Sequence, residues 1–297
     1  KTSLPLELLE GVVLVGNADL TVPCVKELLK RGLPVTFLSG KGDYYGRLES
    51  TRHVNVERQR MQFRCGDDRD FCLQFAKRII SAKINNQVVL LRRYNMRAED
   101  HAVEENIGEI RTYERRLNRC NNLEEALGFE GISSRLYFKS LARLCNKDFP
   151  FKGRTRMPPK DPFNSLLSFG YTLLMYEVYN AIALKGLNPY AGFMHKDKHG
   201  HPALASDLLE EWRPVIVDSL VMNLLNNQGF SKDDFVKDSE SEAVFIEKTA
   251  IKKFVRSFED KIRTETSYLS YIDYPVSFRK AILFQVGVVI KAIEENN

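Results

Sequence analysis

From about residue 70 onward, apolar side chains in this sequence recur every three to four residues almost to the end of the chain. Between Phe71 and Arg93, one helical face is formed by Phe71, Phe75, Ile79, Ala82 and Leu90, with Arg and Lys interleaved. Further helices are predicted over residues 102–119, 123–145, 163–184, 203–226, 242–264 and 276–294. The pattern therefore predicts a nearly all-α domain over residues 68–297.

The first 67 residues have a different pattern. Residues 11–15 and 33–38 are short runs rich in β-branched side chains that end at turn-forming residues, and residues 44–48 resemble a third strand. Between the first two runs, Thr21 can cap a helix that ends before Gly32. We predict an α+β protein of two domains: a small β-rich domain over residues 1–67 and the larger helical domain after it.

Composition narrows the class of protein. The apolar share of 43% is that of an ordinary globular chain, and no apolar run approaches the roughly 18 residues of a membrane span. The five cysteines are scattered without a C-x-x-C pair, which favours reduced thiols and a cytoplasmic location. The formal net charge is +5, and clustered Lys and Arg would attract a polyanion, for which nucleic acid is the natural candidate.

Acidic residues in the second domain form a candidate metal site. Asp207 and Glu210 are three residues apart, so on a helix their carboxylates lie about one turn apart on the same side. His195 precedes them, and Glu130 lies on an earlier predicted helix. Carboxylates with one imidazole suit Mg²⁺ or Mn²⁺ better than Zn²⁺, and such ions usually act on phosphates.

The sequence around these residues has local features that bear on function. Glycines flank Glu130, where they destabilise a helix unless close approach is needed. His195 lies in a glycine-containing segment predicted to be a loop, and Pro214 is expected to bend the helix near Glu210. The spacing of His195 and His199 does not match the His-Glu-x-x-His helix of zinc proteases, so that activity is rejected.

Taken singly, each of these signals has a structural alternative. The acids near residue 210 also fit a solvated helix face opposite Leu204, Leu208 and Val215, and His195 fits a hydrogen-bonded, half-buried side chain. Trp212 is expected to be a packing anchor and not a base-stacking platform. The residues alone leave a metal site and a solvated face both open.

Longer segments resemble the signature of a known family, the CRISPR-associated integrases that capture new spacers. The resemblance lies in residues 187–195 (LNPYAGFMH) and 204–214 (LASDLLEEWRP), in 128–131 (GFEG) with Arg135, and in 161–171 (DPFNSLLSFGY). In the first domain it includes residues 9–14 (LEGVVL) and 42–48 (GDYYGRL). It spans nearly the whole chain in the family's order.

The resemblance implies a catalytic site and a reaction. The metal ligands would be Glu130, His195 and Glu210, with Asp207 as a supporting catalytic acid, and the ion would be Mg²⁺ or Mn²⁺. The implied reaction is attack of the 3′-hydroxyl of a captured DNA fragment on a phosphodiester of a CRISPR repeat, and water in place of the hydroxyl would give endonuclease activity. Two alternatives remain: a nuclease or transposon-type integrase of the same fold outside CRISPR immunity, and a non-catalytic DNA-binding scaffold.

The resemblance also implies partners. They are double-stranded DNA, a second copy of the chain bound through the first domain, and a small ferredoxin-like adaptation protein in a heterohexamer. The chain begins inside the family's amino-terminal pattern, without its opening strands, which is expected of either a trimmed chain or one joined to a nuclease.

DNA binding requires lysines and arginines that contact phosphates. A stripe of arginines recurs every four residues on one predicted helix, and other basic residues flank the candidate site or lie in a basic loop over residues 146–161 that is expected to be mobile. The candidates are Arg111, Arg115, Arg119, Arg135, Lys152, Arg154, Arg156 and Lys198. For the stripe, DNA contact and exposed solubility charges fit equally well.

Overall fold

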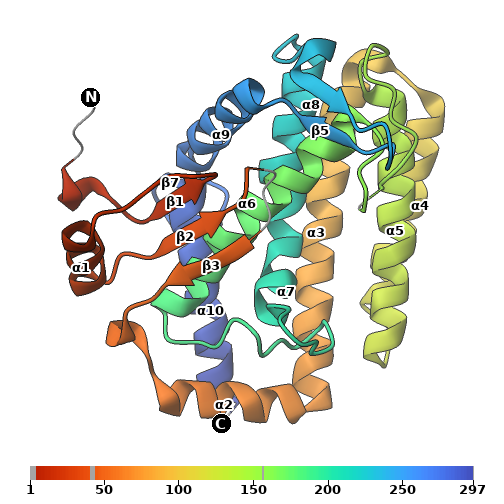
Figure 1. Cartoon of the computed structure of the whole chain (residues 1–297). Coiled ribbons are helices and arrows are strands. Elements are labelled where there is room, and N and C mark those ends of the chain that lie inside the picture. Colours follow the sequence, from red (N-terminus) through yellow and green to blue (C-terminus); the bar gives the residue numbers. More distant parts are fainter. Residues whose placement is uncertain (1–4, 41–43, 156, 297) are drawn as a thin grey trace.

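A small sheet near the N-terminus and a group of long helices make up the computed structural model, which describes residues 5–40, 44–155 and 157–296 (Figure 1). The sheet contains β1 (Val12–Val15), β2 (Val35–Leu38) and β3 (Tyr44–Leu48) in that order. β1 and β2 are parallel and β2 and β3 antiparallel. The predicted α+β fold, with its small β region first and a mostly helical part after it, is confirmed.

The helix between the first two strands allows them to pair in parallel. α1 (Val22–Arg31) has Pro23 in its first turn and ends at Gly32, whose φ of 71° is a left-handed conformation that glycine adopts without strain. This helix is the crossover that a parallel strand pair needs. Val35 and Leu38 of the central strand are fully buried.

The helical part follows the predicted order. The helices are α2 (Val56–Asp67), α3 (Arg69–Ala98), α4 (His101–Leu117), α5 (Leu123–Leu144), α6 (Pro162–Leu184), α7 (Ala203–Trp212), α8 (Ser219–Asn226), α9 (Lys248–Arg263) and α10 (Phe278–Glu295). Short 3₁₀ turns lie at Leu6–Leu8, Thr51–His53 and Lys232–Asp234, and a π-helical segment at Arg213–Asp218. Two further strand pairs are β4 (Phe235–Lys237) with β5 (Val244–Ile246), and β6 (Glu265–Thr266) with β7 (Val276–Ser277).

One of the predicted helices is wrong in part, and another contains a π-helical segment. Residues 244–246 form strand β5 against β4, and helix α9 begins only at Lys248. The apolar triplet there consists of β-branched and aromatic side chains, which favour a pleated surface once a partner strand is present. The helix predicted over residues 203–226 is helical over those bounds, and its middle is the π-helical segment, which begins one residue before Pro214.

Helix α2 was not predicted, and it lies before the proposed domain boundary. It packs against α3 and α10, and Figure 1 shows it across the base of the molecule, next to the C-terminus. Its Gln62 is fully buried and reaches the later loop that carries His195. The boundary between residues 67 and 68 therefore stays a prediction.

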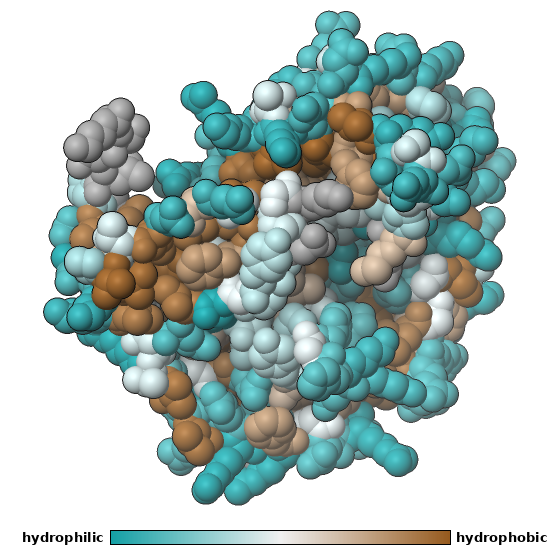
Figure 2. Space-filling model, in the orientation of Figure 1, coloured by the Kyte–Doolittle hydropathy of each residue, from teal (hydrophilic) through white to brown (hydrophobic). Residues whose placement is uncertain are grey.

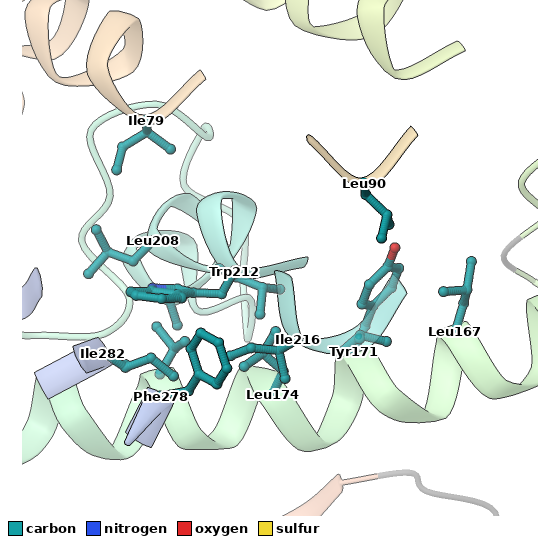
Figure 3. Packing of buried hydrophobic residues seen from close by; sticks show 14 of the residues in the cluster. Ile79, Leu90, Leu167, Tyr171, Leu174, Leu208, Trp212, Ile216, Phe278 and Ile282 are labelled. Atoms are coloured by element: carbon teal, nitrogen blue, oxygen red, sulfur yellow. The ribbon is translucent and has the colours of Figure 1, made fainter. Parts of the chain in front are cut away.

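The core is continuous through the helical part. Figure 3 shows Trp212 packed with Leu208, Ile216, Phe278 and Ile282, which joins α7 and the π-helical segment to α10. Trp212 is fully buried, and its indole Nε1 donates to Gln285 Oε1 at 2.7 Å. It is thus the packing anchor that the sequence predicted.

The surface differs between the two parts of the molecule. Figure 2 shows apolar side chains gathered over the N-terminal sheet and polar side chains over the outer face of the long helices. Among the described residues, none of the helices combines the length and the apolar character that crossing a bilayer requires.

Candidate metal centre

Asp207, in the second turn of α7, organises the loop that carries His195. Its carboxylate is fully buried and accepts backbone hydrogen bonds from Phe193 at 2.7 Å, Met194 at 3.0 Å and His195 at 2.9 Å. Asp207 Oδ1 also lies 2.7 Å from His195 Nδ1. Because a carboxylate oxygen accepts, Nδ1 is the donor, and in the neutral imidazole Nε2 keeps its lone pair.

The loop can approach Asp207 because Gly192 has no side chain. A Cβ at this position would lie 2.8 Å from Ala203 Cβ and 2.9 Å from Asp207 Oδ2, closer than packed atoms come. The other side of the loop is held by Gln62, whose Nε2 donates to the carbonyls of Asn188 and Ala191 at 2.8 and 2.7 Å. The loop is thus fixed from α7 and from α2.

Glu130 and Glu210 come from α5 and α7 and meet at one cation, the ammonium of Lys83 on α3. Lys83 Nζ donates to Glu210 Oε2 at 2.5 Å and to Glu130 Oε1. Ser134, one turn after Glu130, donates to the same oxygen at 2.8 Å. Lys83 is only 7% exposed, so the two carboxylates compensate a charge that has almost no water around it.

A second cation and a buried acid lie next to this pair. Arg213 Nε lies 3.2 Å from Glu210 Oε1, an ion pair without hydrogen-bond geometry, and its guanidinium stacks 4.3 Å above the Tyr171 ring. The Tyr171 hydroxyl donates to Asp218 at 2.5 Å, and Tyr137 donates to the other oxygen of Asp218 at 2.7 Å. The π-helical segment begins with Arg213 and ends with Asp218, so it joins the two clusters.

The charged groups of the site shift one another's pKa values. Burial disfavours the ionised form of Glu210, yet Arg213 and Lys83 lower its pKa to about 2. Burial likewise opposes the charge on Lys83, but Glu210 and Glu130 hold its pKa above the ordinary value. The hydrogen bond to Asp207 raises the pKa of His195. Burial raises the pKa of Asp218 to about 6 despite its two tyrosine donors.

The carboxylate oxygens of Glu130 and Glu210 fit a hard divalent cation by their chemistry, and Lys83 is the cation that they bind in this structure. Two carboxylates from different helices converge on a single positive charge, and oxygen is the ligand that Mg²⁺ and Mn²⁺ prefer. Among the described residues, however, no three His, Cys, Asp or Glu side chains are grouped closely enough to hold a metal. Lys83 occupies the position between the carboxylates that such an ion would take.

Comparison with known proteins identifies the family. The family described as CRISPR associated protein Cas1 matches residues 1–260. The chain belongs to the Cas1 family. It is 35% identical over 298 residues to the CRISPR-associated endonuclease Cas1 of Mycobacterium tuberculosis (strain CDC 1551 / Oshkosh), covering 99% of this chain and 86% of that protein. It is 37% identical over 289 residues to a Cas4 exonuclease/Cas1 endonuclease fusion of Geobacter sulfurreducens, covering 94% of this chain and 51% of the fusion.

Solved structures agree on the Cas1 fold. The Cas1 protein of Thermotoga maritima superimposes with a TM-score of 0.82 at 23% identity, over 98% of this chain and 88% of that one. A chain of a Cas6-RT-Cas1–Cas2 complex gives 0.83 at 24% identity, over 100% of this chain and 32% of that one. A casposase bound to its integration product gives 0.82 at 22% identity, over 96% and 79%.

The structure brings the four predicted catalytic residues of this Cas1 chain into two adjoining groups. Asp207 and His195 form one group, and Glu130 and Glu210 form the other. Asp207 and Glu210, the two acids of α7, are both buried. The solvated-face alternative is therefore wrong for Asp207 and Glu210. Lys83 was not predicted, although a lysine flanked by the apolar Ile80 and Ile84 in a predicted helix signals an ion pair inside the protein.

The basic residues predicted to bind DNA lie in different environments. Arg115, Arg119, Arg135, Lys152 and Lys198 are exposed. Arg111 is half-buried and bonded to Glu114 at 2.7 Å and to Asn85 at 3.0 Å. Arg154 is also half-buried, and it donates to Asn164 and Ser168 and lies over the Tyr171 ring. Arg156 lies outside the described residues.

Proposed function

We propose that this Cas1-family chain is a metal-dependent DNA integrase and endonuclease that inserts captured DNA fragments into a CRISPR array. The observation that supports the proposal is the convergence of Glu130 and Glu210 on one cation, next to an imidazole oriented by Asp207. A site of this kind suits phosphodiester chemistry, in which a cation must compensate charge on both the attacking oxygen and the phosphate.

Each residue has a stated role in the proposal. Glu130, Glu210 and His195 would hold Mg²⁺ or Mn²⁺, which when bound lowers the pKa of a DNA 3′-hydroxyl and neutralises charge on the attacked phosphate. Asp207 keeps the imidazole in one orientation through Nδ1, so that Nε2 faces the reaction. Where water takes the place of the 3′-hydroxyl, the same groups support hydrolysis.

The DNA would be held by basic side chains around the site. We assign phosphate contacts to Arg115, Arg135 and Lys198, which are exposed, and to Arg111, Arg154 and Arg156. Lys198 follows His195 in the same loop, so a contact there would place the phosphate beside the imidazole. Arg111 and Arg154 would have to exchange an internal partner for a phosphate oxygen.

The proposed assembly follows the relatives. We infer a homodimer formed through the first domain, bound to the small ferredoxin-like adaptation protein, because a Cas1-containing chain of this fold is named in a complex with Cas2. An associated Cas4-type nuclease is proposed because a relative carries one as a fusion. Insertion into a chromosomal array requires a cytoplasmic location.

The test is a strand-transfer assay with the protein, its small partner, a short duplex with free 3′-hydroxyls, a repeat-bearing plasmid and Mn²⁺. Wild type should give half-site products, and His195→Ala should lower their yield by at least about a hundredfold. His199→Ala, an exposed neighbour in the same loop, is the matched control and should keep the yield. Undiminished products with His195→Ala would reject the site. Cleavage without strand transfer would favour the nuclease alternative.

A further inference from the structure

Lys83 is a cation inside the molecule at the point where the proposed metal would bind. It lies in the middle of α3, a 30-residue helix, and its side chain ends between α5 and α7. Its neighbours one turn away on the same helix, Ile79, Ile80 and Gln87, are buried as well. The ammonium therefore has the carboxylates of Glu130 and Glu210 in place of water.

The two carboxylates need a positive charge to remain together. Like charges at close range in a protein interior repel each other strongly, and the ion pair of Arg213 reaches Glu210 Oε1 but not Glu130. Among the described residues, only Lys83 forms ion pairs with both acids, through Glu130 Oε1 and Glu210 Oε2. It thus positions side chains from two helices at one point.

A divalent cation bound to the same oxygens would repel this ammonium. A metal ligated by Glu130 Oε1 and Glu210 Oε2 would lie roughly 2 Å from the oxygens that Lys83 now contacts. Two cations that share the same acceptor oxygens repel each other, so a metal that takes these two oxygens would drive the ammonium away from them.

Resting on the function proposed above, we propose that Lys83 is the internal counter-cation of the metal site, which holds Glu130 and Glu210 together and leaves them when the divalent ion binds. Metal binding is then an exchange of one cation for another, and not the filling of a vacant site. Lys83 is a positioning residue in this scheme. It prearranges the carboxylates and at the same time weakens the affinity for the metal.

The first test uses wild-type protein and needs no variant to fold. Amine acetylation by N-hydroxysuccinimidyl acetate, followed by peptide mass spectrometry, measures the reactivity of each lysine with and without Mn²⁺. Without metal, the buried and ion-paired Lys83 should react slowly, and Mn²⁺ should raise its rate several-fold. Lys77, on the same helix and partly exposed, is the internal control and should not change. An unchanged or lower rate at Lys83 would overturn the proposal.

The second test measures Mn²⁺ affinity by isothermal titration calorimetry. Lys83→Met removes the competing cation, and we expect binding to tighten by about tenfold, because the metal no longer has to displace an ammonium that repels it. Lys77→Met should bind Mn²⁺ as wild type does. Equal or weaker binding by folded Lys83→Met would contradict the exchange. If Lys83→Met does not fold, the acetylation result decides.

A third variant separates this inference from the proposed function. Glu130→Gln should weaken Mn²⁺ binding if Glu130 is a ligand. If Glu130→Gln binds Mn²⁺ as wild type does, the proposed metal site itself is rejected. If Glu130→Gln loses the metal while Lys83 shows neither the acetylation change nor the affinity change, only the exchange is rejected.

Discussion

The site has two halves that are built in different ways. Asp207 and His195 belong to one loop–helix segment, and the carboxylate accepts from three consecutive backbone amides of that loop. Glu130 and Glu210 belong to separate helices and are linked through Lys83 of a third. A local half is fixed by the conformation of one segment, whereas a long-range half is fixed by the packing of α3, α5 and α7.

The two halves are expected to respond differently when an acidic side chain is removed. Removal of the local acid exposes unpaired amides in one loop, and the rest of the fold has no reason to change. Removal of a long-range acid leaves a buried cation without its partner, and the penalty spreads to three packed helices.

Asp207→Ala tests the local half. The change leaves three buried backbone N–H groups and His195 Nδ1 without their acceptor, so we expect the free energy of unfolding to fall by about 4 kcal/mol. Chemical denaturation with fluorescence of Trp212 measures it. Asp197→Ala, an exposed acid in the same loop, should stay within about 0.5 kcal/mol of wild type. A result for Asp207→Ala as small as the control would contradict the local arrangement.

Glu210→Gln tests the long-range half. The variant keeps the shape of the side chain but leaves Lys83 and Arg213 with less compensation in a buried site, and we expect a loss of about 3 kcal/mol. Glu109→Gln on the exposed face of α4 serves as its control. If Glu210→Gln is as stable as this control, the ion pairs do not hold the three helices together, and the contrast between the two halves disappears.

Asp218→Asn extends the comparison to pH. Because burial raises the pKa of Asp218 to about 6, above the ordinary value of about 4, the folded protein keeps this proton to a higher pH than the unfolded chain does. Ionisation in the buried site therefore lowers the stability of wild type as pH rises from about 4 to 6. Asparagine does not ionise, so the variant should gain about 2 to 3 kcal/mol relative to wild type over this range.

Urea denaturation of both proteins at pH 4 and pH 7 measures the difference. One tyrosine hydroxyl can still donate to the asparagine Oδ1, and the other can accept from Nδ2, so a general loss of packing is not expected. A stability difference that is the same at both pH values would show that Asp218 titrates normally.

Arg115→Glu has the smallest expected effect and tests the surface around both halves. Arg115 is exposed, and its guanidinium donates only to Thr112 at 3.0 Å in the described hydrogen bonds. Charge reversal should weaken duplex DNA binding by a few-fold at moderate salt and independently of sequence. Arg97→Glu at the end of α3 is the control. Unchanged binding, measured by fluorescence anisotropy, would remove Arg115 from the DNA footprint.

The local half of the site could be predicted from the sequence, and the long-range half could not. His195 and Asp207 lie in one motif with its glycine, so their proximity follows from a short segment. The meeting of Glu130 with Glu210 depends on how α5 and α7 pack on α3, which periodicity does not specify. Here the family resemblance supplied the ligand set, and Lys83 was missed because it belongs to no acidic or metal-binding pattern.

The fold shows the same limit. Strands β1 to β3 and most helices were predicted, because their apolar patterns are local. Helix α2 was missed because most of its side chains are polar and Gln62 is buried through bonds to a distant loop. Residues 244–246 were assigned to a helix because their strand conformation depends on pairing with β4, and the sequence of residues 244–246 does not show that pairing.

The π-helical segment Arg213–Asp218 gives this part of the chain a tolerance of length that the helices around it lack. Segments of this kind hold an extra residue within a helical path. A deletion of one residue inside the segment therefore returns the path to the ordinary α-helical repeat, and α8 keeps the same face toward the core. The same deletion inside α8, which has no extra residue, would turn the rest of that helix by about 100°. Helix α8 thus depends on its exact length, whereas the segment before it does not.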